Sequence, residues 1–140
     1  MIAIEGIDHI VLRTSKLEAM CHFYCDVLGC QIERELEPEM GLTQLRAGSA
    51  LIDLVSMDGK LGKLGGEPPR QEGRNLDHFC LQYVGLEETE LLQHLNKHGI
   101  ASSEYATRYG AQGFGRSIYI QDPEGNVVEL KPFQPLFKSH

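Results

Sequence analysis

Four polar residues stand inside apolar stretches that would otherwise read as buried β-strands. They are His9 in "IDHIVL", Asp53 in "ALIDLV", His78 in "LDHFCL" and Glu129 in "NVVEL". An ionised carboxylate between apolar strand residues costs on the order of several kcal/mol unless a charged partner or a metal compensates it. Two neutral imidazoles and two carboxylates suit a divalent ion such as Ni, Co, Zn, Mn or Fe, and leave positions open for water or substrate. The four residues therefore predict one divalent-metal site.

The two histidine stretches begin two similar halves of the chain. His9 and His78 are 69 positions apart, Gly29 and Gly99 are 70 apart, and the two carboxylates are 76 apart, so one insertion in a hairpin reconciles the offsets. In a duplicated fold, equivalent strands can face one another across a curved sheet, which would bring the four donors to one point. The alternative is that the histidines are satisfied core residues and the carboxylates are partly exposed on one sheet face.

A helix is expected after each histidine stretch. Apolar residues recur at helical spacing over residues 15–28 and again over residues 86–98. The phrase "SKLE" at residues 15–18 fits a capping box, and Gly29 or Gly99 stands where each helix should end.

Three strands are expected after each helix, in the order βαβββ, so the sequence predicts an α+β fold built from two modules. The first set is "QIERELE", "LTQLRAG" and "SALIDLVS"; the second is "SSEYATR", "RSIYIQ" and "NVVELK". Clustered Gly and Pro between the halves indicate a linker or lid without strands. We expect one domain made of module 1 (1–57), a linker (58–75) and module 2 (76–140).

Composition narrows the classes of partner. The formal net charge of -7 and the absence of a basic run oppose binding to nucleic acid or to an anionic membrane. The N-terminus lacks a signal-peptide pattern, and no apolar stretch approaches the roughly 18 to 20 residues of a membrane helix, so we expect a cytoplasmic protein. The four cysteines form no CxxC pair and are interpreted as reduced, largely buried thiols.

The pattern resembles the vicinal oxygen chelate superfamily, which includes glyoxalase I, extradiol dioxygenases, fosfomycin-resistance thiol transferases and metal-free bleomycin-binding proteins. The resemblance covers nearly the whole chain, through "DHIVLRT" and "FYCDVLG" in the first module and "LDHFCL" and "DPEGNVVEL" in the second. It implies paired βαβββ modules that form a curved, half-open mixed-sheet cleft. In several members a homodimer completes the cleft, so a homodimer is expected here.

The resemblance also implies roles for individual residues. The metal positions of the family fall on His9, Asp53, His78 and Glu129, and Glu129 would be the catalytic base. Glyoxalase I normally has a glutamate at the second position; the shorter Asp53 would reach the metal only through water, or would face the substrate instead. Arg13 lies where similar glyoxalases place an arginine that contacts a substrate carboxylate.

Three functions follow as expectations. The first is a metal-dependent lyase or isomerase of glyoxalase type, acting on a small substrate that chelates the metal through adjacent oxygens, with glutathione or another thiol as a possible co-substrate. The second is an Fe(II)-dependent extradiol-type dioxygenase, since two histidines and one glutamate match the facial triad. The third is a metal-free drug-binding protein like those of bleomycin resistance.

A glycine-rich segment, "RYGAQGFGRS" at residues 108–117, is expected to border the cleft. It lacks the Lys-Ser/Thr ending and the following helix of a phosphate-binding loop. It is either a flexible hairpin or a substrate-contacting loop, and in the second case Tyr109, Phe114 and Arg116 would bind substrate.

Overall fold

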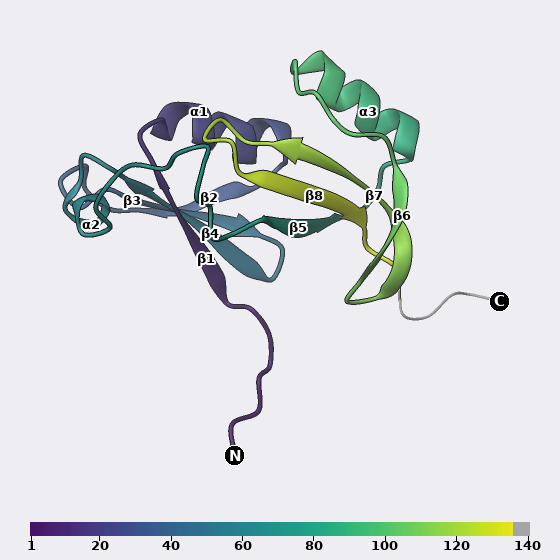
Figure 1. Cartoon of the computed structure of the whole chain (residues 1–140), viewed down its shortest axis with the longest axis horizontal. Coiled ribbons are helices and arrows are strands. Elements are labelled where there is room, and N and C mark those ends of the chain that lie inside the picture. The colour runs from purple at the N-terminus through teal and green to yellow at the C-terminus, as the bar shows by residue number, and fades with distance from the viewer. Residues whose placement is uncertain (136–140) are drawn as a thin grey trace. The chain divides into compact units, whose positions relative to one another are not determined.

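The structure is a computed structural model and describes residues 1–135; the last five residues of the expected second module lie outside the described residues. The chain divides into two compact units, unit 1 at Met1–Glu72 and unit 2 at Gly73–His140. Figure 1 labels the α-helices and strands of both. Each unit is described separately below.

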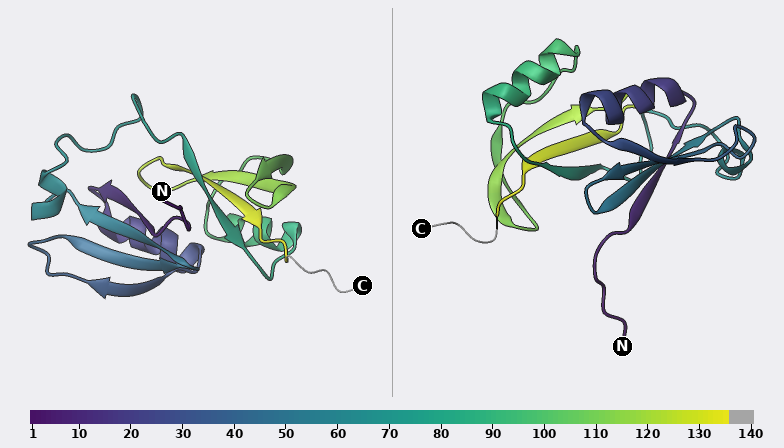
Figure 2. Two further views of the ribbon diagram at one scale, coloured as in Figure 1. Left: turned by 90° about the horizontal axis from the view of Figure 1, so that it is seen from below. Right: turned by 180° about the vertical axis from the view of Figure 1, so that it is seen from behind.

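Unit 1 contains a four-stranded mixed sheet in the order β1-β4-β3-β2, with β1 and β4 parallel and the other pairs antiparallel. Two consecutive helical segments connect β1 to β2, as Figure 2 shows from two further sides. The elements are β1 (His9–Thr14), α1 (Leu17–Cys21), the π-helix η1 (His22–Val27), β2 (Gln31–Glu35), β3 (Leu42–Ala47), β4 (Ala50–Ser56) and α2 (Lys60–Lys63).

Unit 2 repeats this plan with the order β5-β8-β7-β6 and a parallel β5–β8 pair. Its elements are β5 (His78–Tyr83), α3 (Glu88–Lys97), β6 (Ala106–Gly110), β7 (Gly113–Gln121) and β8 (Val127–Pro132). The predicted order βαβββ, occurring twice, is therefore confirmed, and with it the α+β class. In both units the strand that carries the histidine pairs with the strand that carries the carboxylate.

The helix of unit 1 is correctly predicted in place but not in form. α1 packs against β4, and its apolar side continues through η1. The helix buries Met20, Phe23, Tyr24 and Val27. The expected capping box is wrong, because Lys16 is the N-cap and makes no side-chain capping bond. The Lys16 backbone N–H instead donates to the Thr14 hydroxyl at 2.8 Å.

The helix of unit 2 has well-formed ends. Glu87 and Glu90 make a reciprocal capping box at the first turn of α3. At the other end Gly99 has a φ of 71°, a conformation that favours glycine. The Gly99 and Ile100 N–H groups donate to the carbonyls of Asn96 and Leu95, which completes the expected termination.

The glycine-rich segment 108–117 is a strand hairpin. β6 and β7 pair through it with a two-residue turn, and β6 begins four residues later than expected, at Ala106. The glycines serve a close approach, because a Cβ on Gly110 would lie 2.8 Å from the Lys131 ammonium nitrogen and one on Gly115 would lie 2.9 Å from Lys131 Cε. Lys131 is buried and donates to the carbonyls of Arg108 and Gly113 at 3.1 and 2.7 Å.

The segment expected to be a linker contains the short helix α2 and no strand over residues 58–75. Hydrogen bonds hold this segment at two places, since Arg13 donates to the carbonyls of Gly62 and Gly66, and Arg74 donates to Asn126 and the Glu124 carbonyl.

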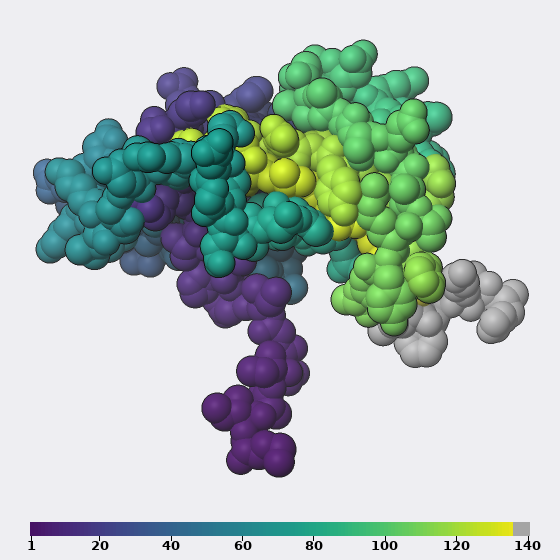
Figure 3. Space-filling model, viewed as in Figure 1, coloured from purple at the N-terminus to yellow at the C-terminus, as the bar shows by residue number. Residues whose placement is uncertain are grey.

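At the N-terminus, residues 1–8 project from unit 1 as a narrow arm in Figure 3. Among the described residues no helix has the length and apolarity needed to cross a membrane.

All four cysteines lie in the described part of the chain and are free thiols, as expected. They are more exposed than expected, because Cys80 is exposed and the other three are intermediate in exposure. Burial raises the pKa of Cys30 to about 11, and nearby Cys25 adds to the shift. Burial also raises the pKa of Cys80 to about 11; Glu129 adds to that shift and Lys131 opposes it. At pH 8 such a thiol is roughly 0.1% thiolate.

We therefore expect Cys30 and Cys80 to react with a disulfide reagent at pH 8 at least about tenfold more slowly in the native chain than in the urea-unfolded chain. Between pH 8 and 9 the native rates should rise about tenfold, because the thiolate fraction is still far from saturation. Mass spectrometry of the labelled peptides measures each rate. Equal native and unfolded rates would contradict the protonated state of these thiols.

Candidate metal and substrate site

In unit 2 the structure brings His78 and Glu129 together. His78 Nε2 lies 3.2 Å from Glu129 Oε1. His78 is the first residue of β5, and Cys80 lies two residues further along the same strand. Glu129 on β8 is the cross-strand partner of Cys80, so the side chains of His78 and Glu129 lie on the same sheet face. Glu129 is 7% exposed. A carboxylate this buried needs compensation, and the histidine is a close polar neighbour that can supply it.

Each histidine is oriented by the aspartate before it. Asp77 Oδ2 lies 2.7 Å from His78 Nδ1, and Asp8 Oδ1 lies 2.6 Å from His9 Nδ1. A proton on Nδ1 satisfies each contact and leaves the Nε2 lone pair free, which is the arrangement that orients histidine ligands of metals. The repeated Asp-His dipeptide thus has one physical use in both units.

The contacts of His78 require a positive charge at the imidazole ring or between the ring and Glu129. Both of its ring nitrogens face carboxylate oxygens, of Asp77 and of Glu129. A neutral imidazole carries one proton, so one of the two contacts would set two lone pairs against each other. Either a second proton on the ring or a bound cation removes this repulsion. Nε2 and Oε1, 3.2 Å apart, are close enough for both to bind one divalent ion.

In unit 1 Asp53 carries a buried polar atom that lacks a partner. Asp53 is 4% exposed, and its Oδ2 accepts a hydrogen bond of 3.2 Å from Gln44. Its Oδ1 has no hydrogen-bond partner among residues 1–135. The hydrogen bond to Asp8 raises the pKa of His9 above 6.5, and the charge of Asp53 adds to that effect. The bare oxygen of Asp53 fits a metal or substrate contact.

Each unit therefore holds two donors: His78 contacts Glu129 in unit 2, and in unit 1 the charge of Asp53 acts on His9. Within residues 1–135 no group of three or more His, Cys, Asp or Glu side chains is close enough to hold a metal ion. A single centre that joins His9 and Asp53 to His78 and Glu129 remains a prediction. The donors of each unit are an imidazole nitrogen, which is a borderline ligand, and a carboxylate oxygen, which is a hard one. This donor chemistry fits a divalent ion.

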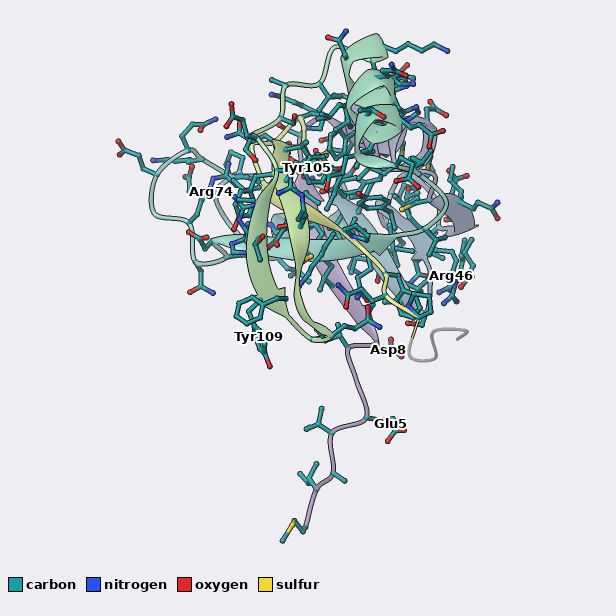
Figure 4. The ribbon with its side chains drawn as sticks, turned by 90° about the vertical axis from the view of Figure 1, so that its right-hand side faces the viewer. Glu5, Asp8, Arg46, Arg74, Tyr105 and Tyr109 are labelled. Atoms are coloured by element: carbon teal, nitrogen blue, oxygen red, sulfur yellow. The ribbon has the colours of Figure 1, made fainter. Side chains whose placement is uncertain are left out.

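Tyr109, Phe114 and Arg116 lie on β6 and β7, and their expected role in substrate binding stays a prediction. Tyr109 and Phe114 are cross-strand partners with ring centroids 5.0 Å apart, 74% and 69% exposed, and Figure 4 shows Tyr109 projecting away from the sheet. Arg116 pairs with Glu88 of α3 at 2.6 Å. Because strand residues alternate, Arg116 lies on the sheet face opposite Glu129.

Arg13 is held by the chain itself. Its Nη2 donates to two carbonyls of the α2 segment, and a Cβ on Gly65 would meet the Arg13 guanidinium at 2.3–2.4 Å. Its Nε is buried without a hydrogen-bond partner in the described part of the chain. A contact to a substrate carboxylate would have to displace or add to these bonds.

Several residues around the carboxylates were not predicted. Ser117 Oγ donates to Glu129 Oε2 at 2.6 Å, and Gln44 donates to Asp53 from the adjoining strand. The sequence does contain one signal for the groups that orient the predicted metal ligands: both His9 and His78 follow an aspartate. The strand partners have no such signal, because they depend on which residues the sheet register sets side by side.

Comparison with known proteins shows the family to which the chain belongs. Residues 6–130 match the Glyoxalase/Bleomycin resistance protein/Dioxygenase superfamily. The chain is similar to a catechol-2,3-dioxygenase of Bacillus subtilis (strain 168), with 25% identity over 92% of this chain and 42% of that protein. The chain thus spans less than half the length of this relative.

Two solved structures have a similar fold. The integron cassette protein VCH_CASS1 from the mobile metagenome of V. cholerae is 25% identical, with a TM-score of 0.74, over 96% of this chain and 99% of that one. A lactoylglutathione lyase from Agrobacterium tumefaciens is 24% identical, with a TM-score of 0.66, over 93% of this chain and 95% of that one. These matches support the fold that the strand order had already indicated.

Proposed function

Since the chain belongs to the Glyoxalase/Bleomycin resistance protein/Dioxygenase superfamily, we propose that it is a divalent-metal-dependent enzyme of glyoxalase type, a lyase or isomerase. The observation that carries this proposal is the contact of His78 Nε2 with Glu129 Oε1, with Asp77 on the other ring nitrogen. His9, Asp53, His78 and Glu129 would hold the ion, which would be Ni, Co, Zn, Mn or Fe.

The chemistry divides between the ion and the chain. A bound divalent ion would polarise two adjacent oxygens of a small substrate as a Lewis acid. Glu129 would take a proton on Oε1 from the carbon next to the carbonyl and return it to the former carbonyl carbon. The substrate hydroxyl would pass its proton to the former carbonyl oxygen, so the isomerisation needs no added oxidant or reductant. Asp8 and Asp77 would orient His9 and His78 through their Nδ1 atoms. The low exposure of Glu129 would limit competition from water.

The substrate and the assembly complete the proposal. The substrate would be a small molecule, and a hemithioacetal of glutathione or another thiol is the first candidate. A homodimer would fit the superfamily pattern, and its presence is measured by sedimentation of the purified chain. Arg13 would meet an anionic group of the substrate, in competition with its bonds to Gly62 and Gly66.

A second candidate is an Fe(II)-dependent extradiol-type dioxygenase. It is supported by the similarity to a catechol-2,3-dioxygenase over 92% of this chain and by the two histidines and one glutamate, which match the ligand set of such enzymes. It differs from the first candidate in needing O₂ and a catechol. A metal-free drug-binding protein is the third outcome that the experiment below distinguishes.

The test is elemental analysis of protein purified without chelators, followed by turnover with two probes. We expect about one equivalent of divalent metal per chain, and conversion of the methylglyoxal–glutathione hemithioacetal equally well with and without O₂. Turnover of catechol that stops without O₂, with iron bound, would select the dioxygenase. Protein that contains no metal and takes none up would contradict both enzymes and favour the binding protein.

A further inference from the structure

Five side chains on one face of the unit 2 sheet form a closed circle of contacts. Glu129 contacts His78 through Oε1 and accepts a 2.6 Å hydrogen bond from Ser117 on Oε2. Arg108 donates to Ser117 Oγ at 3.1 Å, and its guanidinium lies 4.3 Å over the ring of Tyr119. The Tyr119 ring meets His78 edge-on at 5.2 Å between centroids. Two of the five side chains, His78 and Glu129, are proposed metal ligands, and they contact each other.

The direction of the hydrogen bonds in this circle is fixed by chemistry. A guanidinium has only donors, so Ser117 Oγ accepts from Arg108 and its single proton is directed to Glu129. Arg108 also donates to the Ser117 carbonyl, which holds the backbone of that residue as well. Ser117 is fully buried. Oε2 of Glu129 is therefore engaged, and Oε1 is the oxygen left to face His78.

We propose that Ser117 and Arg108 are positioning residues that make Glu129 a one-oxygen ligand, with Oε1 toward the ion. The inference rests on the proposed function, because it assigns a role within the same metal site. A hydrogen-bonded carboxylate cannot swing to present both oxygens without losing a buried, charge-assisted bond. The outer partners of metal ligands typically change metal affinity by about 10- to 100-fold when removed.

Unit 1 contains a related arrangement at the equivalent strands. Arg34 on β2 donates to Gln44 on β3 at 3.1 Å, and Gln44 donates to Asp53 on β4 at 3.2 Å. Again an arginine donates to a neutral side chain, which donates to one carboxylate oxygen and leaves the other bare. The recurrence on β6, β7 and β8 of unit 2 supports a role tied to the carboxylates, since the intermediate residues differ in type.

The experiment compares Ser117→Ala with Ser117→Thr in the full chain. Competition with a chelating indicator measures Zn²⁺ affinity, and the visible spectrum of bound Co²⁺ reports the donor set. We expect Ser117→Ala to weaken Zn²⁺ binding at least about 10-fold and to change the Co²⁺ bands, because Glu129 Oε2 becomes free. Ser117→Thr keeps the hydroxyl and should restore both measurements. Arg108→Gln should weaken Zn²⁺ binding by a smaller factor.

Thr107→Ala is the matched control, since Thr107 is an exposed hydroxyl residue on the neighbouring strand, paired with Arg116. It should leave affinity and spectrum unchanged. A wild-type chain that binds both ions, with Ser117→Ala indistinguishable from it, overturns the positioning role and leaves the proposed function standing. A wild-type chain that binds neither ion overturns both.

Discussion

Glu129→Gln is expected to lower metal affinity at least about 100-fold and the proposed turnover at least about 10⁴-fold. Glutamine has the same shape, and its oxygen can still accept the hydrogen bond of Ser117, so the sheet around it should be retained. It lacks the negative charge that would bind the ion and the basic oxygen that would move the proton. Indicator competition and steady-state kinetics measure the two losses, with Glu33→Gln on the surface as control.

Matched histidine variants extend this test to the other unit. His78→Ala and His9→Ala should each weaken metal binding if one centre uses both units. A loss confined to His78→Ala would mean that the ion sits on unit 2 alone, and would remove His9 and Asp53 from the ligand set. Wild-type affinity in Glu129→Gln would contradict the proposed site itself.

The strand order could be predicted because glycines and apolar runs delimit the elements. Each histidine stretch, helix and strand triplet has its own signal, and a glycine with positive φ, such as Gly29 or Gly99, ends each helix. The first and last residues of the strands and helices were less predictable. β6 starts at Ala106, where its pairing with Ser117 begins, and the hairpin continues through Gly110 and Gly113, which composition alone assigns to a loop. The helix of unit 1 also starts one residue later than the expected capping box requires, with Lys16 and not Ser15 at the N-cap.

The site was partly predictable for a related reason. A buried carboxylate between apolar neighbours can be recognised in the sequence, because its desolvation must be compensated. Its compensating partner often lies on another strand. Ser117 reaches Glu129 across the β7–β8 pairing, and that register is not visible in the local sequence. Alternation within β7 then places Ser117 and Arg116 on opposite sheet faces, so the local sequence does not show which of the two lies beside Glu129.

The donor pairs explain why the fold keeps unfavourable polar groups. A site that must accept an ion needs ligand atoms whose other hydrogen bonds are made and whose metal-facing atoms are left bare. Asp53 Oδ1 is such an atom, and leaving it unpaired costs stability until a ligand arrives. The same residue should therefore have opposite effects on the ion-free and the ion-bound chain.

Asp53→Asn is expected to stabilise the ion-free chain by about 1 kcal/mol, or about 3 °C in melting temperature. Removal of a buried charge outweighs the cost of the new NH2 group, which takes the place of Oδ1 without an acceptor, and the amide oxygen can still accept from Gln44. With metal at about 100 times its Kd, the wild-type chain gains about 2.7 kcal/mol. The variant should lose most of that gain, since affinity falls about 100-fold. The order of the two melting temperatures should thus reverse when metal is added. Exposed Asp58→Asn serves as the control and should show no reversal. If Asp53→Asn melts below wild type without metal and gains equally with it, Asp53 is a structural residue and the ion binds without it.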